Sequence, residues 1–143
     1  HIYAIRAVLP SMLERESGYI LHTASMAGIL TTLGNLTYAA AKHAVNGLVK
    51  AAAQEVGTLG ITVNSILPGL IETDIVRETG PESAIAMGLD GYDALIDLFT
   101  QESAIKRPNR VEEVAAVAVL LASDAGRNIT GNMFPVDGGT MPY

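Results

Sequence analysis

The chain has 143 residues, which is enough for one domain with a buried core. Hydrophobic residues make up 49% and charged residues 17%, so the composition excludes a disordered chain. The absence of cysteine excludes disulfides and thiolate metal sites and favours a reducing compartment, so we expect a cytoplasmic protein. The net charge of −6 argues against nucleic acid as a partner, and no apolar run is long enough to imply a membrane partner.

The first predicted elements are a helix over residues 1–15 and a strand over residues 19–25. Apolar residues recur at helical spacing in the first, where Pro10 lacks an amide N–H and favours a bend. The second does not alternate polar and apolar residues, as is typical of a parallel strand covered on both faces. We interpret His22, in mid-strand, as a hydrogen-bonded structural residue. Ser25 falls at the carboxyl end, beyond which ligands bind in open α/β sheets.

The longest predicted helix covers residues 36–56 and follows a loop at 26–35. Its many alanines favour a helix, and it contains no proline. Asn35 or Thr37 is expected to cap its amino terminus. Gly47 weakens such a helix relative to alanine, which indicates close contact with the backbone of another element.

A second strand is predicted over residues 61–67, which are rich in β-branched side chains. Asn64 lies inside it and is expected to make a structural hydrogen bond. Pro68 and Gly69 should end this strand sharply.

The region from about residue 70 to 104 is apolar and is punctuated by glycines and by the pair Gly80-Pro81. It is predicted to form short helices that act as a lid over a substrate, because such flaps close on glycine hinges and exclude water. Ordinary core packing or a subunit contact is the alternative interpretation.

The last predicted elements are a helix over residues 110–123, capped by Asn109, and a short strand over residues 131–136. Pro135 restricts that strand to a sheet edge or to its own end. Helices thus alternate with strands along the chain, which predicts an α/β fold with right-handed crossovers and a parallel sheet.

Three side chains in the first part of the chain combine a hydroxyl, a phenol and an amine: Ser25, Tyr38 and Lys42. The last two are four residues apart on a predicted helix, so they share a face. A free phenol has a pKa of about 10, and a neighbouring cation lowers it. A shift of about three units would need roughly 4 kcal/mol, which two nearby positive charges could supply. The spacing therefore indicates a tyrosine that works as a general acid or base.

At this point the sequence resembles the short-chain dehydrogenase/reductase family. Four elements occur in the family's order and spacing: Y-A-A-A-K at residues 38–42, Ser25 thirteen residues upstream, V-N-S-I-L-P-G at 63–69 with Thr73 completing P-G-x-x-x-T, and the closing T-G and V-D-G-G at 130–131 and 136–139. The resemblance covers nearly the whole chain but only the C-terminal half of the family's domain. It implies a Rossmann-like, doubly wound parallel sheet, of which residues 1–143 would form about three strands with flanking helices.

The resemblance also implies an activity. The chain would belong to an NAD(P)-dependent oxidoreductase that interconverts a secondary alcohol and a ketone. Tyr38 would be the acid or base, Ser25 would hydrogen-bond the substrate oxygen, and Lys42 would lower the pKa of the tyrosine. The partners would be a small carbonyl or alcohol substrate and identical subunits in a homodimer or homotetramer.

The resemblance assigns the cofactor, NAD or NADP, to six residues: Tyr38, Lys42, Pro68, Gly69, Ile71 and Thr73. The lysine would hold the nicotinamide ribose, and the Ile71 backbone and Thr73 hydroxyl would bind the carboxamide. The alternative for Thr73 is that it only caps the helix that follows.

Two other interpretations stay open. The glycine-rich dinucleotide motif is absent, so the chain is either the back half of a longer enzyme or a non-catalytic module that keeps the fold. A metal hydrolase is disfavoured, because the three histidines lack ligand spacing and no G-x-S-x-G motif occurs.

Overall fold

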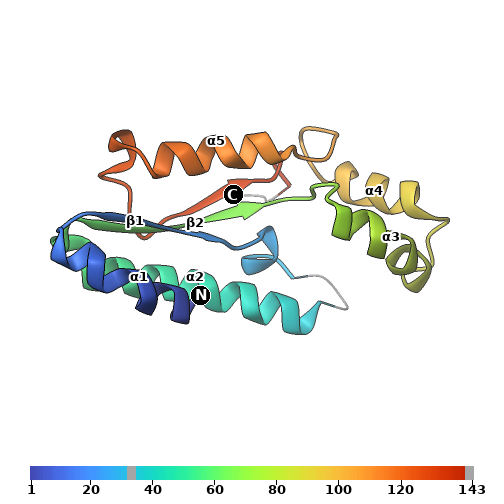
Figure 1. Ribbon diagram of the computed structural model, residues 1–143. Coiled ribbons are helices and arrows are strands. Elements are labelled where there is room, and N and C mark those ends of the chain that lie inside the picture. Colours follow the sequence, from blue (N-terminus) through green and yellow to red (C-terminus); the bar gives the residue numbers. More distant parts are fainter. Residues whose placement is uncertain (32–34, 141–143) are drawn as a thin grey trace.

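The computed structural model describes residues 1–31 and 35–140, so residues 32–34 of the predicted loop at 26–35 lie outside the described residues (Figure 1). Its helices and strands follow one another as α1 (Ile2–Glu14), β1 (Gly18–Thr23), α2 (Leu36–Val56), β2 (Ile61–Pro68), α3 (Asp74–Ala86), α4 (Tyr92–Gln101), α5 (Val111–Leu121) and β3 (Met133–Val136). Short 3-10 turns occupy Met26–Gly28, Gly57–Leu59 and Asp124–Gly126.

The three strands form one parallel sheet in the order β1-β2-β3, in which Gly18 pairs with Ile61 and Ser65 pairs with Met133. Helices α1 and α2 cover one face of the sheet and α5 covers the other, while α3 and α4 lie beyond the carboxyl end of β2 (Figure 1). The predicted α/β fold is confirmed, and its three layers are part of a Rossmann-like doubly wound sheet.

The main core lies between α2 and the sheet. It consists of small and β-branched apolar side chains, namely Ile20, Val49, Ala53, Val56, Ile61 and Val63. The central strand β2 is buried over its first seven residues. Burial on both faces explains why its apolar residues do not alternate with exposed polar ones.

Two predicted strands are shorter in the structure. Strand β1 ends at Thr23, because the chain then turns into the 3-10 turn and leaves Ser25 beyond the strand. Strand β3 begins at Met133 rather than at residue 131, because Gly131 has a φ of 71°, in the left-handed region that a strand excludes. Pro135 sits in this strand at the edge of the described sheet.

Helix α1 contains Pro10, as does the helix predicted over residues 1–15. The pair Gly80-Pro81 does not divide the region after β2, because α3 continues through both residues. A side chain at Gly80 would place its Cβ 2.5 Å from the ring of Tyr92, so the missing side chain lets α4 pack closely on α3. The close contact predicted at Gly47 is also wrong, since within the described residues no atom lies within 4 Å of a Cβ added there.

The amino terminus of α5 differs from the prediction as well. Arg110, not Asn109, is its N-cap residue, and its N–H donates to the carboxylate of Glu113 at 2.8 Å. Asn109 instead donates from its side chain and its backbone to the carbonyl oxygen of Leu70, at 3.3 and 2.8 Å. It thereby ties the loop after β2 to the loop before α5.

Candidate active site

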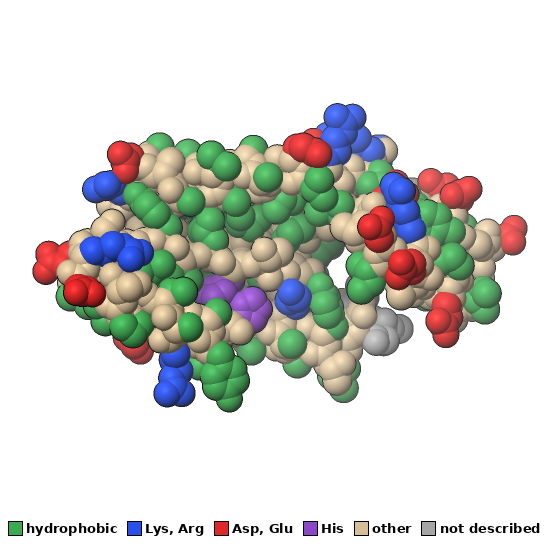
Figure 2. Space-filling model, viewed as in Figure 1, with side chains coloured by type: hydrophobic (Ala, Val, Ile, Leu, Met, Phe, Trp, Pro, Cys, Tyr) green, Lys and Arg blue, Asp and Glu red, His purple; other side chains and the backbone are tan. Residues whose placement is uncertain are grey.

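A cavity of about 430 Å³ lies at the carboxyl ends of β1 and β2. Ser25, Tyr38 and Gly69, from three separate elements, are among the residues that line it. Phe99 and Glu102 from the end of α4 form part of its wall. Figure 2 shows a notch in the surface between the α3–α4 pair and the body of the molecule. The fold therefore brings together residues that are far apart in the chain at the edge where α/β sheets bind ligands.

Ser25 reaches the cavity from the turn that follows β1. Its backbone is extended, with φ −174° and ψ 159°, and it is the N-cap of the Met26–Gly28 turn. Its hydroxyl oxygen accepts a hydrogen bond from the N–H of Ala27 at 3.1 Å. A hydroxyl has one proton and two lone pairs, so this bond leaves the proton of Ser25 free to be donated.

Tyr38 and Lys42 lie on one face of α2, as their spacing requires. Tyr38 is 48% exposed and lines the cavity. The Lys42 ammonium lies 5.5 Å from the centroid of the Tyr38 ring and donates a hydrogen bond to the carbonyl oxygen of Thr23 at 3.2 Å. The lysine is therefore held between the tyrosine and the end of β1, although it does not itself line the cavity.

A buried polar network fixes the Ser25 turn against α2 and β2. The side-chain amide of Asn46 donates to the carbonyl oxygen of Gly28 at 3.0 Å, and its oxygen accepts from the Ser65 hydroxyl at 3.0 Å. Asn46 is 6% exposed and Ser65 is fully buried. Neither residue was predicted as part of the site. The available signal was an asparagine on the apolar face of a helix, beside Val45 and Val49.

The loop after β2 is held by a close backbone approach at Gly69. Its N–H donates to the carbonyl oxygen of Val136 at 2.9 Å. An added Cβ at Gly69 would lie 2.8 Å from the Cα of Asp137 and 2.7 Å from the side-chain nitrogen of Asn109. Of the predicted residues in this loop, only Gly69 lines the cavity with Ser25 and Tyr38, while Pro68 is the last residue of β2.

Ile71 and Thr73 complete this loop. Ile71 forms an isolated parallel bridge with Asn109. Thr73 is the N-cap residue of α3, yet its side chain makes no capping hydrogen bond, and the described residues supply its hydroxyl with no partner. The geometry thus gives no support to side-chain capping as the role of Thr73.

Helices α3 and α4 are tied to the loop after β2 through a tyrosine. The Tyr92 hydroxyl donates to the Glu72 carboxylate at 3.1 Å. Burial, and next this hydrogen bond, raise the pKa of Tyr92 above its usual 10. The tie and the packing of Tyr92 on Gly80 make α3 and α4 one unit beside the cavity.

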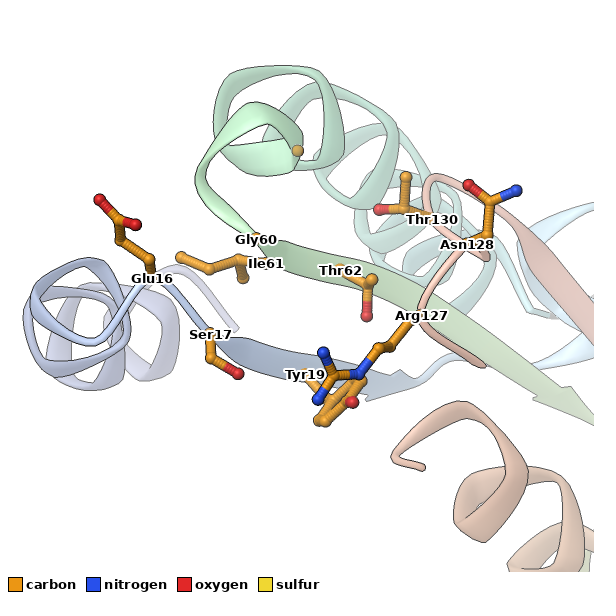
Figure 3. Close-up of a pocket in the computed structure, with 10 residues that line it drawn as sticks. Glu16, Ser17, Tyr19, Gly60, Ile61, Thr62, Arg127, Asn128 and Thr130 are labelled. Carbon is orange, nitrogen blue, oxygen red and sulfur yellow. The ribbon is translucent and has the colours of Figure 1, made fainter. Parts of the chain in front are cut away.

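A second hollow, of about 280 Å³, lies at the opposite end of the strands (Figure 3). Tyr19, Thr62 and Arg127 are among its lining residues, and none of the predicted site residues is. Arg127 pairs with Asp124 at 2.9 Å, and this carboxylate raises the pKa of the guanidinium. The Thr62 hydroxyl is buried and has no hydrogen-bond partner among the described residues.

The histidines are not gathered at the cavity. His22 shares a hydrogen bond of 2.8 Å between its Nδ1 and that of His1, in line with the structural role expected for it. Burial lowers the pKa of His22 below its usual 6.5. Within residues 1–31 and 35–140, no group of three potential metal ligands occurs. In the same part of the chain, every helix is too short or too polar to cross a bilayer.

Comparison with known proteins gives consistent matches. The family model described as enoyl-(acyl carrier protein) reductase matches residues 1–141. The chain is 35% identical to D-beta-hydroxybutyrate dehydrogenase of Rhizobium meliloti, over 96% of this chain and 53% of that protein. It is 37% identical to the 3-oxoacyl-[acyl-carrier-protein] reductase FabG of Pseudomonas aeruginosa, over 94% of this chain and 49% of the relative.

A solved structure agrees with these matches. The F189W actinorhodin polyketide ketoreductase with NADPH superposes with a TM-score of 0.85 at 31% identity, over 92% of this chain and 50% of the other. The chain spans about half the length of the relatives that it matches. Because the family model covers nearly every residue and the fold agrees, the chain belongs to the short-chain dehydrogenase/reductase family.

Proposed function

We propose that this chain carries the catalytic residues of an NAD(P)-dependent oxidoreductase that interconverts a secondary alcohol and a ketone. One observation carries the proposal: Ser25 and Tyr38 line the same cavity, and the Lys42 ammonium lies against the Tyr38 ring. Membership of an oxidoreductase family supports it, as do the relatives named as a dehydrogenase and reductases.

In this proposal Tyr38 donates a proton to the carbonyl oxygen during reduction and takes it back during oxidation. Ser25 donates a second hydrogen bond to the same oxygen, using the proton that its bond from Ala27 leaves free. The Lys42 ammonium, held by the Thr23 carbonyl, stabilises the negative charge that remains on the Tyr38 oxygen. Tyr38 and Ser25 therefore stabilise the negative charge that develops on the substrate oxygen during the reaction, and Lys42 stabilises the charge that develops on the Tyr38 oxygen.

The cofactor, NAD or NADP, would supply or accept the hydride. The residues present fit it, because the half-buried Thr73, in the loop between β2 and α3, has a hydroxyl without a partner among the described residues. Tyr38, Lys42, Pro68, Gly69, Ile71 and Thr73 would hold its nicotinamide end. A related ketoreductase whose structure contains NADPH supports this assignment.

We also propose that residues 1–143 form the C-terminal part of one domain of a longer enzyme that works as a homodimer or homotetramer. The segment 70–104, which holds α3 and α4, would act as its substrate lid, since α4 already forms a wall of the cavity. A non-catalytic module is the alternative, because the chain spans only about half of its relatives. The intact mass of the natural protein decides between them: a mass well above 15.0 kDa supports the longer enzyme.

The decisive experiment replaces Tyr38 with phenylalanine in the full-length natural protein. Loss of the phenol proton should lower kcat by about 10²–10⁴-fold in nicotinamide-linked ketone reduction. Tyr3→Phe is the matched control, because Tyr3 is 84% exposed on α1 and removal of its hydroxyl should leave kcat unchanged. Near-normal turnover by Tyr38→Phe, with the fold intact by circular dichroism, would refute the role of Tyr38.

A further inference from the structure

Asn46 links three of the elements that form the candidate active site. It lies on α2, one helical turn after Lys42, so the two residues share one face of the helix. Its side-chain amide donates to the Gly28 carbonyl oxygen in the turn after β1, and its side-chain oxygen accepts from the Ser65 hydroxyl on β2. Residues of this chain bury Asn46 and supply both of these partners.

The turn connects the position of Gly28 to that of Ser25 through two hydrogen bonds. The Gly28 N–H donates to the Ser25 carbonyl oxygen at 2.9 Å, while Asn46 binds the Gly28 carbonyl oxygen. The N–H of Ala27, in the same turn, donates to the Ser25 hydroxyl oxygen at 3.1 Å, so the orientation of that hydroxyl also depends on the turn. A shift of the turn along α2 would therefore move the hydroxyl of Ser25.

Strand pairing holds Ser25 on its amino-terminal side. The Ala24 N–H donates to the Ile66 carbonyl oxygen at 2.8 Å, which continues the pairing of β1 with β2 up to the residue before the serine. The chain then leaves the sheet, and Ser25 begins the 3-10 turn. The bond from Asn46 to Gly28 holds this turn against α2. Ser25 is therefore fixed between a strand contact on one side and the Asn46 contact on the other.

We propose that Asn46 is a positioning residue for the reaction, and that it acts through the Gly28 turn on the hydroxyl of Ser25. The proposal rests on the proposed function, in which Ser25 donates a hydrogen bond to the substrate oxygen. Such a donor stabilises the transition state only in a narrow range of positions, and a displacement of about 1 Å can lower the rate by about 10²-fold. The alternative is that Asn46 only satisfies buried polar groups and contributes to stability.

The test is a double-mutant cycle between Asn46 and Ser25 in the full-length protein. Asn46→Leu keeps the branched shape of the side chain and removes both of its hydrogen bonds. It should lower kcat by about 10²-fold in nicotinamide-linked ketone reduction, and KM for the ketone should change less than kcat. In Ser25→Ala, which has no hydroxyl to misplace, the same substitution should lower kcat by less than about twofold.

Asn64→Leu is the matched control for lost stability. Asn64 is also buried, but it is not among the residues that line the cavity. Its side chain donates to the Ile129 carbonyl oxygen at 2.7 Å and accepts from the Asn132 N–H at 3.1 Å. Asn64→Leu should lower the urea midpoint of unfolding about as much as Asn46→Leu does, and it should leave kcat of the folded protein unchanged.

A second variant covers the case in which Asn46→Leu alone does not fold. Asn46→Leu combined with Ser65→Ala also removes the hydroxyl that would otherwise be buried without its partner, so it should fold more readily. Because the bond to Gly28 is still lost, kcat should fall by the same factor as in Asn46→Leu, and again only when the Ser25 hydroxyl is present.

The outcomes separate this proposal from the proposed function. If the Asn46 substitution lowers kcat equally with and without the Ser25 hydroxyl, or does not lower it, the positioning role is overturned while the proposed function stands. If Ser25→Ala alone leaves kcat unchanged, the serine has no role in the reaction, and both the positioning role and that part of the proposed function fail.

Discussion

Replacing Gly28 with alanine tests how the Ser25 turn is positioned. An added Cβ would lie 2.7 Å from the side-chain nitrogen of Asn46 and 2.9 Å from the carbonyl oxygen of Lys42. Both contacts are shorter than packed atoms adopt, and the second is with helix backbone that cannot turn away. Because Gly28 does not have a positive φ, alanine can adopt its backbone conformation, and the cost is one of space alone.

The magnitude follows from two contributions. Overpacking of a tightly packed site costs about 1–3 kcal/mol. Separation of the turn from α2 would also break the hydrogen bond from Asn46 to the Gly28 carbonyl, and a buried amide left unpaired costs about 1–3 kcal/mol. We expect Gly28→Ala to lower the free energy of unfolding by about 2–4 kcal/mol, because some relaxation offsets these costs.

The matched control is Gly47→Ala, on α2 next to Asn46, the residue that contacts Gly28. There the added Cβ meets no described atom within 4 Å, so the substitution should stabilise the helix by about 0.5–1 kcal/mol. Urea unfolding of the full-length protein measures both changes. Turnover gives a second readout, since displacement of Ser25 by about 1 Å could lower kcat by about 10²-fold in Gly28→Ala. If both variants unfold at the same urea concentration, the close approach at Gly28 is not what holds the turn.

Three further predictions concern other parts of the molecule. Side-chain hydrogen bonds from Arg107, and next the Arg110 N–H, lower the pKa of the Glu113 carboxyl to about 2. The stabilisation of the folded state by these bonds should therefore be complete above pH 4.5 and be lost as the pH falls through about 2. A Glu113 carboxyl that titrates near pH 4.5 by ¹³C NMR would contradict this prediction. Thr62→Val should leave stability unchanged or raise it, because it removes a buried hydroxyl that lacks a described partner, and a loss of more than about 1 kcal/mol on urea unfolding would reveal a partner elsewhere. The chain of 143 residues expressed alone should aggregate or unfold without cooperativity, because the described sheet leaves one edge of β1 unpaired. Its accessible surface of 8785 Å² also exceeds the roughly 7,000 Å² expected for a compact protein of 15.0 kDa. A sharp thermal transition of a monomer would count against this prediction.

Local sequence patterns predicted the main elements well where the signal is itself local. The alanine-rich run gave helix 36–56 with the boundaries that the structure has. The apolar run before Pro68 gave the central strand to within one residue. Boundaries failed where one residue's backbone angle decides them, as at Gly131, whose left-handed conformation cannot be inferred from glycine alone.

Contacts between distant segments were harder to predict. Gly80 and Pro81 look like a helix break, yet α3 continues through both, and Tyr92, twelve residues further on, packs where a side chain at Gly80 would be. Asn109 looks like a helix cap, yet its side chain binds Leu70 in a loop that precedes it by 39 residues. In both cases a tertiary contact overrides a local preference, and the sequence pattern does not contain that contact.

The candidate site also depends on a contact between distant segments. The motif spacing identified Ser25, Tyr38 and Lys42, but spacing alone does not explain how a turn and a helix keep a fixed relation. Apolar contacts could hold these elements together in several closely similar positions, because such contacts have little directionality. The hydrogen bonds of Asn46 to Gly28 and Ser65 are directional and buried, so a displacement of the turn along α2 would leave polar atoms unpaired at a cost of about 1–3 kcal/mol each. The relative position of Ser25 and Tyr38 therefore depends on an asparagine that belongs to none of the motifs.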